Sequence, residues 1–261
     1  MLGLSFKKYG KKSMSNNNNL TLKTDEKLMH ISISQRFFIV PILILFAASI
    51  LAQITSLDTM IANEFYDFGN KSWLGDNTWW ANTLIHDWGR YLIALILLSS
   101  FTVFITSFLI QDKLKKYRRV TAYLCLCIVL TTSLVGLGKK YSNVDCPRDL
   151  NRYGGNQPYV HVFSAKPSSY PSGRCFPGGH SSGAFSLYAL YFISLLLLPR
   201  HARKVFITVT LLGLTYGLGQ WARGSHFVIH DIWSAAVGWY ISLGLFYMLF
   251  QYRYKTVLKK H

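Results

Sequence analysis

Charged side chains are scarce in this sequence: Asp, Glu, Lys and Arg make up only 15% of its 261 residues. Soluble globular domains carry about 25%. Hydrophobic residues account for 51%, and the mean hydropathy is +0.22. The few charges stand in short groups separated by long apolar runs. This distribution excludes an ordinary soluble domain and predicts a membrane protein.

Acidic residues are especially few, with 11 Asp and Glu against 28 Lys and Arg and a net charge of +17. Such a surplus also occurs in nucleic-acid-binding domains. Here the basic residues lie mainly at the ends of apolar runs, as in membrane proteins with positive cytoplasmic loops. We therefore expect a lipid bilayer as the partner of this chain, with no nucleic acid and no protein partner.

The start of the chain lacks a secretory signal pattern, because its apolar run comes late and no small-residue cleavage site follows. Residues 1–36 are polar, and we expect a mobile cytoplasmic tail. Six apolar runs then approach the roughly 20 residues that cross a bilayer. They cover 37–55, 91–110, 120–138, 183–198, 205–221 and 232–250. The sequence predicts an all-α, six-helix membrane domain over 37–252 and a basic tail over 253–261.

Four groups of Lys and Arg set the expected orientation: residues 7–12, 113–119, 200–204 and 253–260. With six spans, all four fall on one side of the membrane, and that side is the cytoplasm by the positive-inside rule. We expect a multi-pass protein of the bacterial inner membrane with both termini cytoplasmic.

Reactive side chains gather on the opposite, outer side, at the ends of different apolar runs. They are Lys139, His180, Arg223, His226 and Asp231. Lys139 and Arg223 lie on the outer side, where the positive-inside rule predicts few cations. Binding of an anionic substrate would explain their presence there. Phosphoryl transfer needs cations around the phosphate, a nucleophile and an acid for the leaving group. This set of residues can provide all three.

These segments resemble the type-2 phosphatidic acid phosphatases, whose motifs are K-x6-R-P, P-S-G-H and S-R-x5-H-x3-D. The resemblance covers roughly residues 91–250, with the motifs in the same order and at the same helix ends. It implies a lipid phosphatase that needs no metal or cofactor and works through a phosphohistidine at the outer face. Lipid A, polyprenyl diphosphate, phosphatidylglycerophosphate and phosphatidic acid all fit such a site. A lipid-to-lipid phosphotransferase of the same family is the alternative.

The first motif departs from the family at its arginine. Lys139 matches the family lysine, but Cys146 stands in the arginine position before Pro147. Arg148 and Arg152 follow closely, and either one supplies a guanidinium for the phosphate.

The second motif is glycine-rich and precedes a predicted helix. Gly178 replaces the family serine, and His180 is the general acid by resemblance. Backbone N–H groups of Gly178, Gly179 and Ser181, together with the helix dipole, are suited to bind an anion.

The third motif has two alignments. In the first, His226 is the nucleophile and Asp231 orients it, with one residue more than usual between them and Arg223 three residues before. In the second, His230 is the nucleophile, seven residues after Arg223. We favour His226 and keep His230 as its rival.

Two of the four cysteines, Cys146 and Cys175, lie in the predicted outer loop beside motifs one and two. Because that compartment is oxidising, we expect a disulfide between them. Cys125 and Cys127 fall inside an apolar run and are expected to be buried packing residues.

Other functional patterns are incomplete. His226 and His230 have the spacing of a helical metal pair, but Phe227 occupies the place of the H-E-x-x-H glutamate, and we expect no metal. The stretch 179–183 fits G-x-S-x-G, the nucleophile motif of the α/β-hydrolases, but this sequence predicts no α/β domain around it. An intramembrane serine protease would need Gly where His180 stands.

A transporter of anionic lipid would place charges near mid-membrane, where these runs have almost none. His86 and His161 are expected to be solvated or interfacial.

Overall fold

The computed structural model describes residues 35–257. The predicted tail 1–36 lies outside these residues except for its last two positions. Of the predicted tail 253–261, the last four residues also lie outside, and residues 253–257 continue the final helix. The chain divides into two units, 1–41 and 42–261, and the first contributes only residues 35–41 to the described part.

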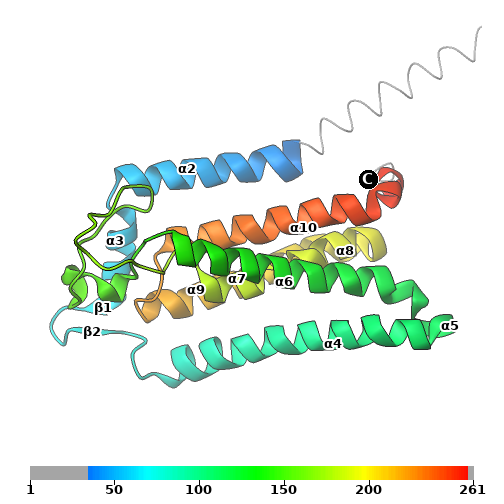
Figure 1. Ribbon diagram of the computed structural model, residues 1–261, viewed down its shortest axis with the longest axis horizontal. Coiled ribbons are helices and arrows are strands. Elements are labelled where there is room, and N and C mark those ends of the chain that lie inside the picture. Colours follow the sequence, from blue (N-terminus) through cyan, green and yellow to red (C-terminus); the bar gives the residue numbers. More distant parts are fainter. Residues whose placement is uncertain (1–34, 258–261) are drawn as a thin grey trace, which may run out of the picture. The chain divides into compact units, whose positions relative to one another are not determined.

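Helices dominate residues 35–257, with one two-stranded hairpin (Figure 1). The early elements are η1 (Gln35–Ile39), α2 (Val40–Ile54), α3 (Leu57–Asn63), β1 (Tyr66–Asp67), β2 (Ser72–Trp73), η2 (Trp80–Trp88) and α4 (Gly89–Leu109). The middle elements are α5 (Gln111–Leu114), η3 (Lys115–Tyr117), α6 (Arg118–Tyr141), η4 (Pro147–Asp149) and η5 (Asn151–Tyr153). The late elements are α7 (Gly179–Phe185), α8 (Tyr188–Leu197), η6 (Pro199–His201), α9 (Ala202–Ala222) and α10 (Val228–Val257).

Six helical segments of the described chain are long and apolar enough to cross a membrane, which confirms the six-span, all-α prediction. They cover Phe37–Ile54, Trp80–Leu109, Gln111–Tyr141, Gly179–Leu197, Pro199–Ala222 and Val228–Phe250. Several of them begin earlier than the apolar runs of the sequence. The reason is that first helical turns carry polar residues, such as His180, which hydropathy does not count as part of a span.

The fourth span, α7 followed by α8, is the most buried of the six spans of the described chain and packs against α6, α9 and α10. α4 lies beside α6, α6 beside α7 and α10, and α9 beside α7 and α8. Leucines such as Leu95, Leu98 and Leu109 remain more than half exposed. Exposed apolar side chains of this kind suit a surface that faces lipid.

Two glycines allow α9 and α10 to approach α7 closely. A Cβ on Gly213 would lie 2.1 Å from a ring carbon of Phe185, and one on Gly238 would lie 2.6 Å from the Phe185 carbonyl oxygen. Any larger residue would push these helices apart. The two contacts hold α7, which begins with Gly179 and His180, against the helices that carry the third motif.

One end of the second unit, which we call the loop end, carries the segments 55–79, 142–178 and 223–227 (Figure 1). Aromatic rings pack there: Tyr66 lies 5.1 Å from Trp73 and 5.2 Å from Tyr153, centroid to centroid. Gly224 adopts a left-handed φ of 62° directly against Trp73, where a Cβ would come within 2.2 Å of the indole. Only glycine fits this turn, which leads the chain from α9 into His226.

Candidate functional site

A cavity of about 620 Å³ opens at the loop end between α4, α6, α7 and α9. Side chains from all three sequence motifs line it. They include Lys139 and Arg148 from the first motif region, His180 from the second, and His226 from the third. Helix ends that are far apart in the sequence therefore lie around one cavity.

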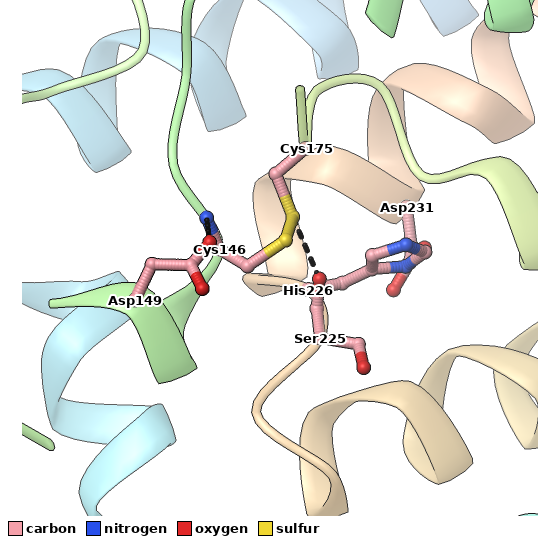
Figure 2. Close-up of a disulfide and its surroundings, with 6 residues drawn as sticks. All are labelled: Cys146, Asp149, Cys175, Ser225, His226 and Asp231. Atoms are coloured by element: carbon pink, nitrogen blue, oxygen red, sulfur yellow. Dashed lines mark hydrogen bonds and ion pairs between the residues drawn. A yellow bond between two sulfur atoms is a disulfide. The ribbon is translucent and has the colours of Figure 1, made fainter. Parts of the chain in front are cut away.

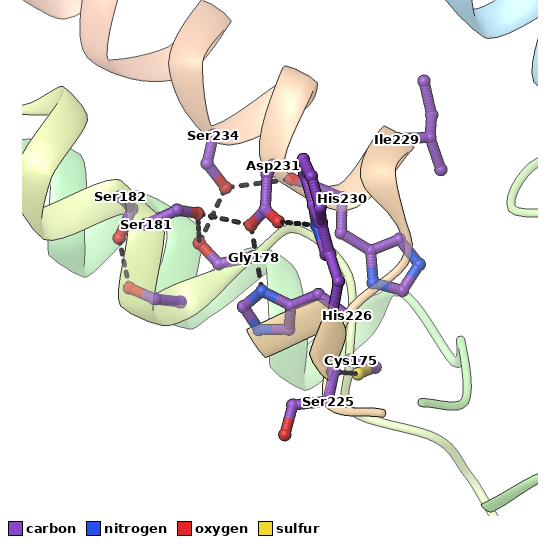
Figure 3. A network of polar contacts seen from close by, with 12 residues as sticks. Cys175, Gly178, Ser181, Ser182, Ser225, His226, Ile229, His230, Asp231 and Ser234 are labelled. Atoms are coloured by element: carbon purple, nitrogen blue, oxygen red, sulfur yellow. Dashed lines mark hydrogen bonds and ion pairs between the residues drawn. The ribbon is translucent and has the colours of Figure 1, made fainter. Parts of the chain in front are cut away.

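His226 and Asp231 form a buried pair in which Nδ1 lies 2.9 Å from Oδ1 (Figure 3). His226 is 4% exposed and Asp231 is 3% exposed. Asp231 accepts two more hydrogen bonds, from Ser181 Oγ at 2.5 Å and from Trp221 Nε1 at 2.6 Å. Because the carboxylate engages Nδ1, Nε2 is the nitrogen of His226 left to react in the cavity.

His230 lies in a different environment, although it is only four residues from His226. Its side chain is 0% exposed and does not line the cavity. The ring packs against Phe176 and Phe227, each 5.5 Å away, and neither nitrogen has a hydrogen-bond partner among the described residues. Its carbonyl oxygen accepts a hydrogen bond from the Gly178 amide at 2.9 Å.

His180 stands in the first turn of α7 and lines the cavity. Its Nε2 lies 3.0 Å from the Ile85 carbonyl oxygen, so this nitrogen carries the proton in that contact. The ring is held between His86, 4.8 Å away, and Tyr216, 5.0 Å away, both nearly parallel to it. This sandwich fixes the ring plane and leaves Nδ1 as the nitrogen that can serve a substrate.

The glycine-rich start of α7 is packed against the His226–Asp231 pair. A Cβ on Gly178 would lie 2.2 Å from Asp231 Oδ1 and 2.9 Å from His226 Nδ1. The family serine has no room here in this arrangement, which accounts for glycine at that position. Gly179 lines the cavity, and Ser181 instead binds Asp231.

The structure separates the two arginine candidates of the first motif. Arg148 lines the cavity. Arg152 instead donates from Nε to Asn63 Oδ1 at 3.0 Å, next to α3, and is not among the cavity residues.

Arg223 lies next to this cavity rather than in its wall. Burial, and then the positive charge of Arg148, lower the pKa of Arg223. Its Nη1 is buried and has no hydrogen-bond partner among the described residues. Two guanidinium groups that repel one another, one of them with an unused buried donor, form an arrangement that a bound anion stabilises.

Cys146 and Cys175 form the expected disulfide (Figure 2). The Cys146 amide donates to Asp149 Oδ2 at 3.2 Å, and the Cys175 amide donates to the Val144 carbonyl at 2.8 Å. Cys175 Sγ also lies 2.7 Å from the Ser225 carbonyl oxygen. The disulfide therefore ties the Arg148 segment to the start of α7 and contacts the residue before His226.

Several cavity residues were not predicted as part of the site, and His86, Arg90 and Gln220 are among them. His86 was expected at the interface, but it lines the cavity and stacks on His180. Gln220 is 3% exposed, and its Nε2 has no partner among the described residues. A sequence signal for it existed, since it stands six residues before His226, where the third motif has arginine.

A family description, the PAP2 superfamily, matches residues 120–254 of this chain. The chain belongs to the PAP2 superfamily. No curated protein and no solved structure matches it. The matched region contains Lys139, His180, His226 and Asp231, but it begins after His86 and Arg90. Family membership supports a phosphatase-type activity on phosphorylated substrates.

Proposed function

We propose that this chain removes phosphate from a membrane lipid through a phosphohistidine formed on His226. The observation that carries the proposal is the His226–Asp231 pair, joined at 2.9 Å, at the wall of a cavity that Lys139 and Arg148 also line. A carboxylate that holds Nδ1–H directs the lone pair of Nε2 into the cavity and stabilises the charged ring formed on attack.

The proposed reaction has two steps. Nε2 of His226 attacks phosphorus, and the P–O bond to the leaving group breaks with its electrons. That oxygen takes the Nδ1 proton of His180, which enters this step as the doubly protonated ring with its Nε2–H on the Ile85 carbonyl. Water then attacks the phosphohistidine, loses a proton to His180, and releases inorganic phosphate together with free His226. His180 thus changes from acid to base between the steps, as microscopic reversibility requires of one group serving both.

Four donors are available for the phosphate oxygens. Lys139, Arg148 and Gln220 line the cavity, and Arg223 lies next to it. Nη1 of Arg223 and Nε2 of Gln220 are buried and have no hydrogen-bond partner within residues 35–257. Cations and amide donors already in position stabilise the charge that spreads over the equatorial oxygens of the transferring group. Arg148 replaces the motif-one arginine in this proposal, and Gln220 stands at the motif-three arginine position.

The shape of the cavity supports a lipid as substrate. Below its polar end it continues between α4 and α6 along Ile93, Leu97 and Ile128. From Lys139 to Ile128, eleven residues along α6 correspond to about 16 Å of helix. A phosphate at Lys139 would therefore have its apolar tail beside two membrane-spanning helices.

The proposed location is the bacterial inner membrane, with both termini cytoplasmic and the loop end outside. The basic groups at 113–119 and 200–204 belong to the connections at the other end of the spans, which supports this orientation.

The test is to incubate the purified protein in EDTA with the four lipids named above and to measure free phosphate and lipid products. We expect phosphate release from at least one lipid and an acid-labile, base-stable phosphoprotein that His226→Ala lacks. Transfer of phosphate to a second lipid, in place of release to water, would identify a phosphotransferase. Absence of both release and transfer from every lipid would refute the proposal.

A further inference from the structure

A second cavity, of about 380 Å³, lies between α2, α10 and the loop before α7. We call it the α2 groove, and its lining residues are Leu45, Phe46, Ser49, Ile50, Gln53, Ile54, Phe163 and Trp233. None of the described residues lines both this groove and the cavity of the candidate site. Its volume falls in the range of small-molecule binding sites. The α2 groove is therefore a separate site that the proposed reaction does not use.

The groove lies along α2 because this helix packs loosely on its neighbours. Between residues 42 and 54, its buried positions are Ser49 and Ala52. The large apolar side chains beside them are mostly uncovered: Phe46 is 60% exposed and Ile50 is 56% exposed. In a helix that is long and apolar enough to span a membrane, such side chains contact hydrocarbon. The open side of the groove therefore faces the acyl chains of the bilayer.

The opposite wall of the groove is aromatic. Phe163 and Trp233 line it with ring centroids 5.7 Å apart, and Phe176 packs against them at 6.2 Å and 5.7 Å. The indole N–H of Trp233 donates to Ser49 Oγ at 3.1 Å and is thus used within the protein. The wall offers apolar ring surface to a ligand. Water does not stay in such a cavity, because a buried water needs two or more polar partners.

The polar end of the groove is formed by Gln53, one residue before α2 ends at the loop end. Its Nε2 donates to Ser164 Oγ at 2.8 Å. Its Oε1 is buried and has no hydrogen-bond partner within residues 35–257. A buried amide oxygen of this kind is stabilised by a donor from a ligand. From Leu45 to Ile54 the helix extends about 14 Å, so the groove leads from this oxygen toward the middle of the membrane.

We propose that the α2 groove binds one acyl chain of a glycerophospholipid whose head group donates a hydrogen bond to Gln53 Oε1. The apolar walls accept the chain, and Gln53 lies where the first span ends at Ile54, the level of lipid head groups. Phosphatidylethanolamine has the required chemistry, since its ammonium group carries N–H donors. Phosphatidylcholine has the same acyl chains and no N–H donor. The bound lipid is a ligand of the membrane domain rather than a substrate, and its site is independent of the proposed phosphatase function.

A lipid in the groove would support residues that adjoin the candidate site. Phe176, which packs against the groove wall, also packs against His230 at 5.5 Å, centroid to centroid. It stands two residues before Gly178, whose amide donates to the His230 carbonyl oxygen at 2.9 Å. A ligand that binds the folded protein and not the unfolded chain stabilises the fold by mass action. We therefore expect the melting temperature to rise when phosphatidylethanolamine is added.

The test titrates the full-length, delipidated protein in detergent with dioleoyl phosphatidylethanolamine or dioleoyl phosphatidylcholine and counts bound lipids by native mass spectrometry. We expect one phosphatidylethanolamine to bind about tenfold to a hundredfold more tightly than phosphatidylcholine, the effect of one hydrogen bond from a charged donor. Gln53→Leu should abolish this preference by weakening the binding of phosphatidylethanolamine alone. Ile50→Trp adds bulk at the groove and should lose both the tightly bound lipid and the rise in melting temperature.

Ile44→Trp is the matched control, since Ile44 is 61% exposed on the same helix and does not line the groove. It should bind phosphatidylethanolamine as the wild type does. Equal binding of this lipid by Ile50→Trp and Ile44→Trp, or equal affinity of the wild type for the two lipids, would overturn the groove proposal. Phosphate release is not measured here, so such a result would leave the phosphatase proposal standing.

Discussion

The indole N–H of Trp221 donates a hydrogen bond to Asp231 Oδ2 at 2.6 Å, while Oδ1 of the same carboxylate faces His226 Nδ1 at 2.9 Å. The last turn of α9 therefore holds Asp231 of α10, the group that orients the proposed nucleophile His226 in the connection between these two helices. Trp221 belongs to no family motif quoted above. It touches Asp231 rather than the cavity, so it is a positioning residue.

Trp221→Phe should lower kcat about tenfold to a hundredfold, because it removes a hydrogen bond to a buried carboxylate and keeps the aromatic volume. KM should change little, since the substrate does not meet this ring. Trp233→Phe is the control: it removes the indole bond to Ser49 Oγ, 3.1 Å long and unconnected to Asp231. An equal loss of kcat in Trp221→Phe and Trp233→Phe would show that the effect comes from packing and not from the hydrogen bond to Asp231.

His226 and His230 should respond differently to substitution. His226→Ala should reduce activity at least about a thousandfold and abolish the phosphoprotein, as expected when a nucleophile is removed. His230→Phe should retain the phosphoprotein, because His230 packs among Phe176 and Phe227 and its nitrogens have no hydrogen-bond partner in the described part of the chain. Replacing two unsatisfied buried polar atoms with carbon should not lower thermal stability. Loss of the phosphoprotein in His230→Phe would favour the rival alignment of motif three.

Arg148→Gln and Arg152→Gln form a matched pair that tests the phosphate clamp. We expect Arg148→Gln to lower kcat/KM about tenfold to a hundredfold, because Arg148 lines the cavity and a charge-assisted contact is lost. Arg152 is bound to Asn63 away from the cavity, and its substitution should leave phosphate release within about twofold. The opposite result would assign the clamp to Arg152.

Removal of the Cys146–Cys175 disulfide should destabilise the loop end. The bond closes a loop with a sequence separation of 29 residues, for which the chain-entropy estimate is about 3–4 kcal/mol. The Cys146→Ser, Cys175→Ser double variant should unfold at a lower temperature in detergent and lose activity in parallel. Reducing agent should reproduce both effects in the wild-type protein and neither in the double variant. Unchanged melting in the variant would contradict this prediction.

Asp58 gives the stability of the loop end a pH dependence. The carboxyl is 4% exposed, and its nearest donor is the Ile229 amide at 3.4 Å, at the start of α10. Burial raises the pKa of Asp58 from 3.8 to about 6, partly offset by that hydrogen bond. The folded protein therefore holds this proton more tightly than the unfolded chain.

It follows that the free energy of unfolding should fall as pH rises from about 4 to about 6, the reverse of the usual carboxylate behaviour. Asp58→Asn should remove this slope and stabilise the protein above pH 6, by an amount on the order of 3 kcal/mol. Thermal melting of both proteins at pH 5 and pH 7.5 measures the difference. If the two proteins differed in melting temperature by the same amount at pH 5 and at pH 7.5, Asp58 would not titrate in this range.

The sequence by itself determined the fold class of this protein. Apolar runs of membrane-spanning length and the grouping of Lys and Arg are local properties of a chain, and the bilayer imposes the same length on every helix. The disulfide could also be predicted from the sequence, because its two cysteines adjoin motifs that a helical bundle places at the same end of the molecule. The sequence set the starts of several spans too late, since polar first turns such as Gly179 and His180 belong to a helix without raising its hydropathy.

Only the tertiary structure separated side chains that are equivalent by sequence. His226 and His230 are four residues apart, yet one lines the cavity and the other is enclosed by aromatic rings. Arg148 and Arg152 are four apart, and only the first lines the cavity. His86 and Arg90 enter the site from a helix that carries no family motif. The physical reason is common to all three cases: the direction and burial of a side chain depend on which neighbouring helix packs against it, and a single segment of sequence does not contain that information.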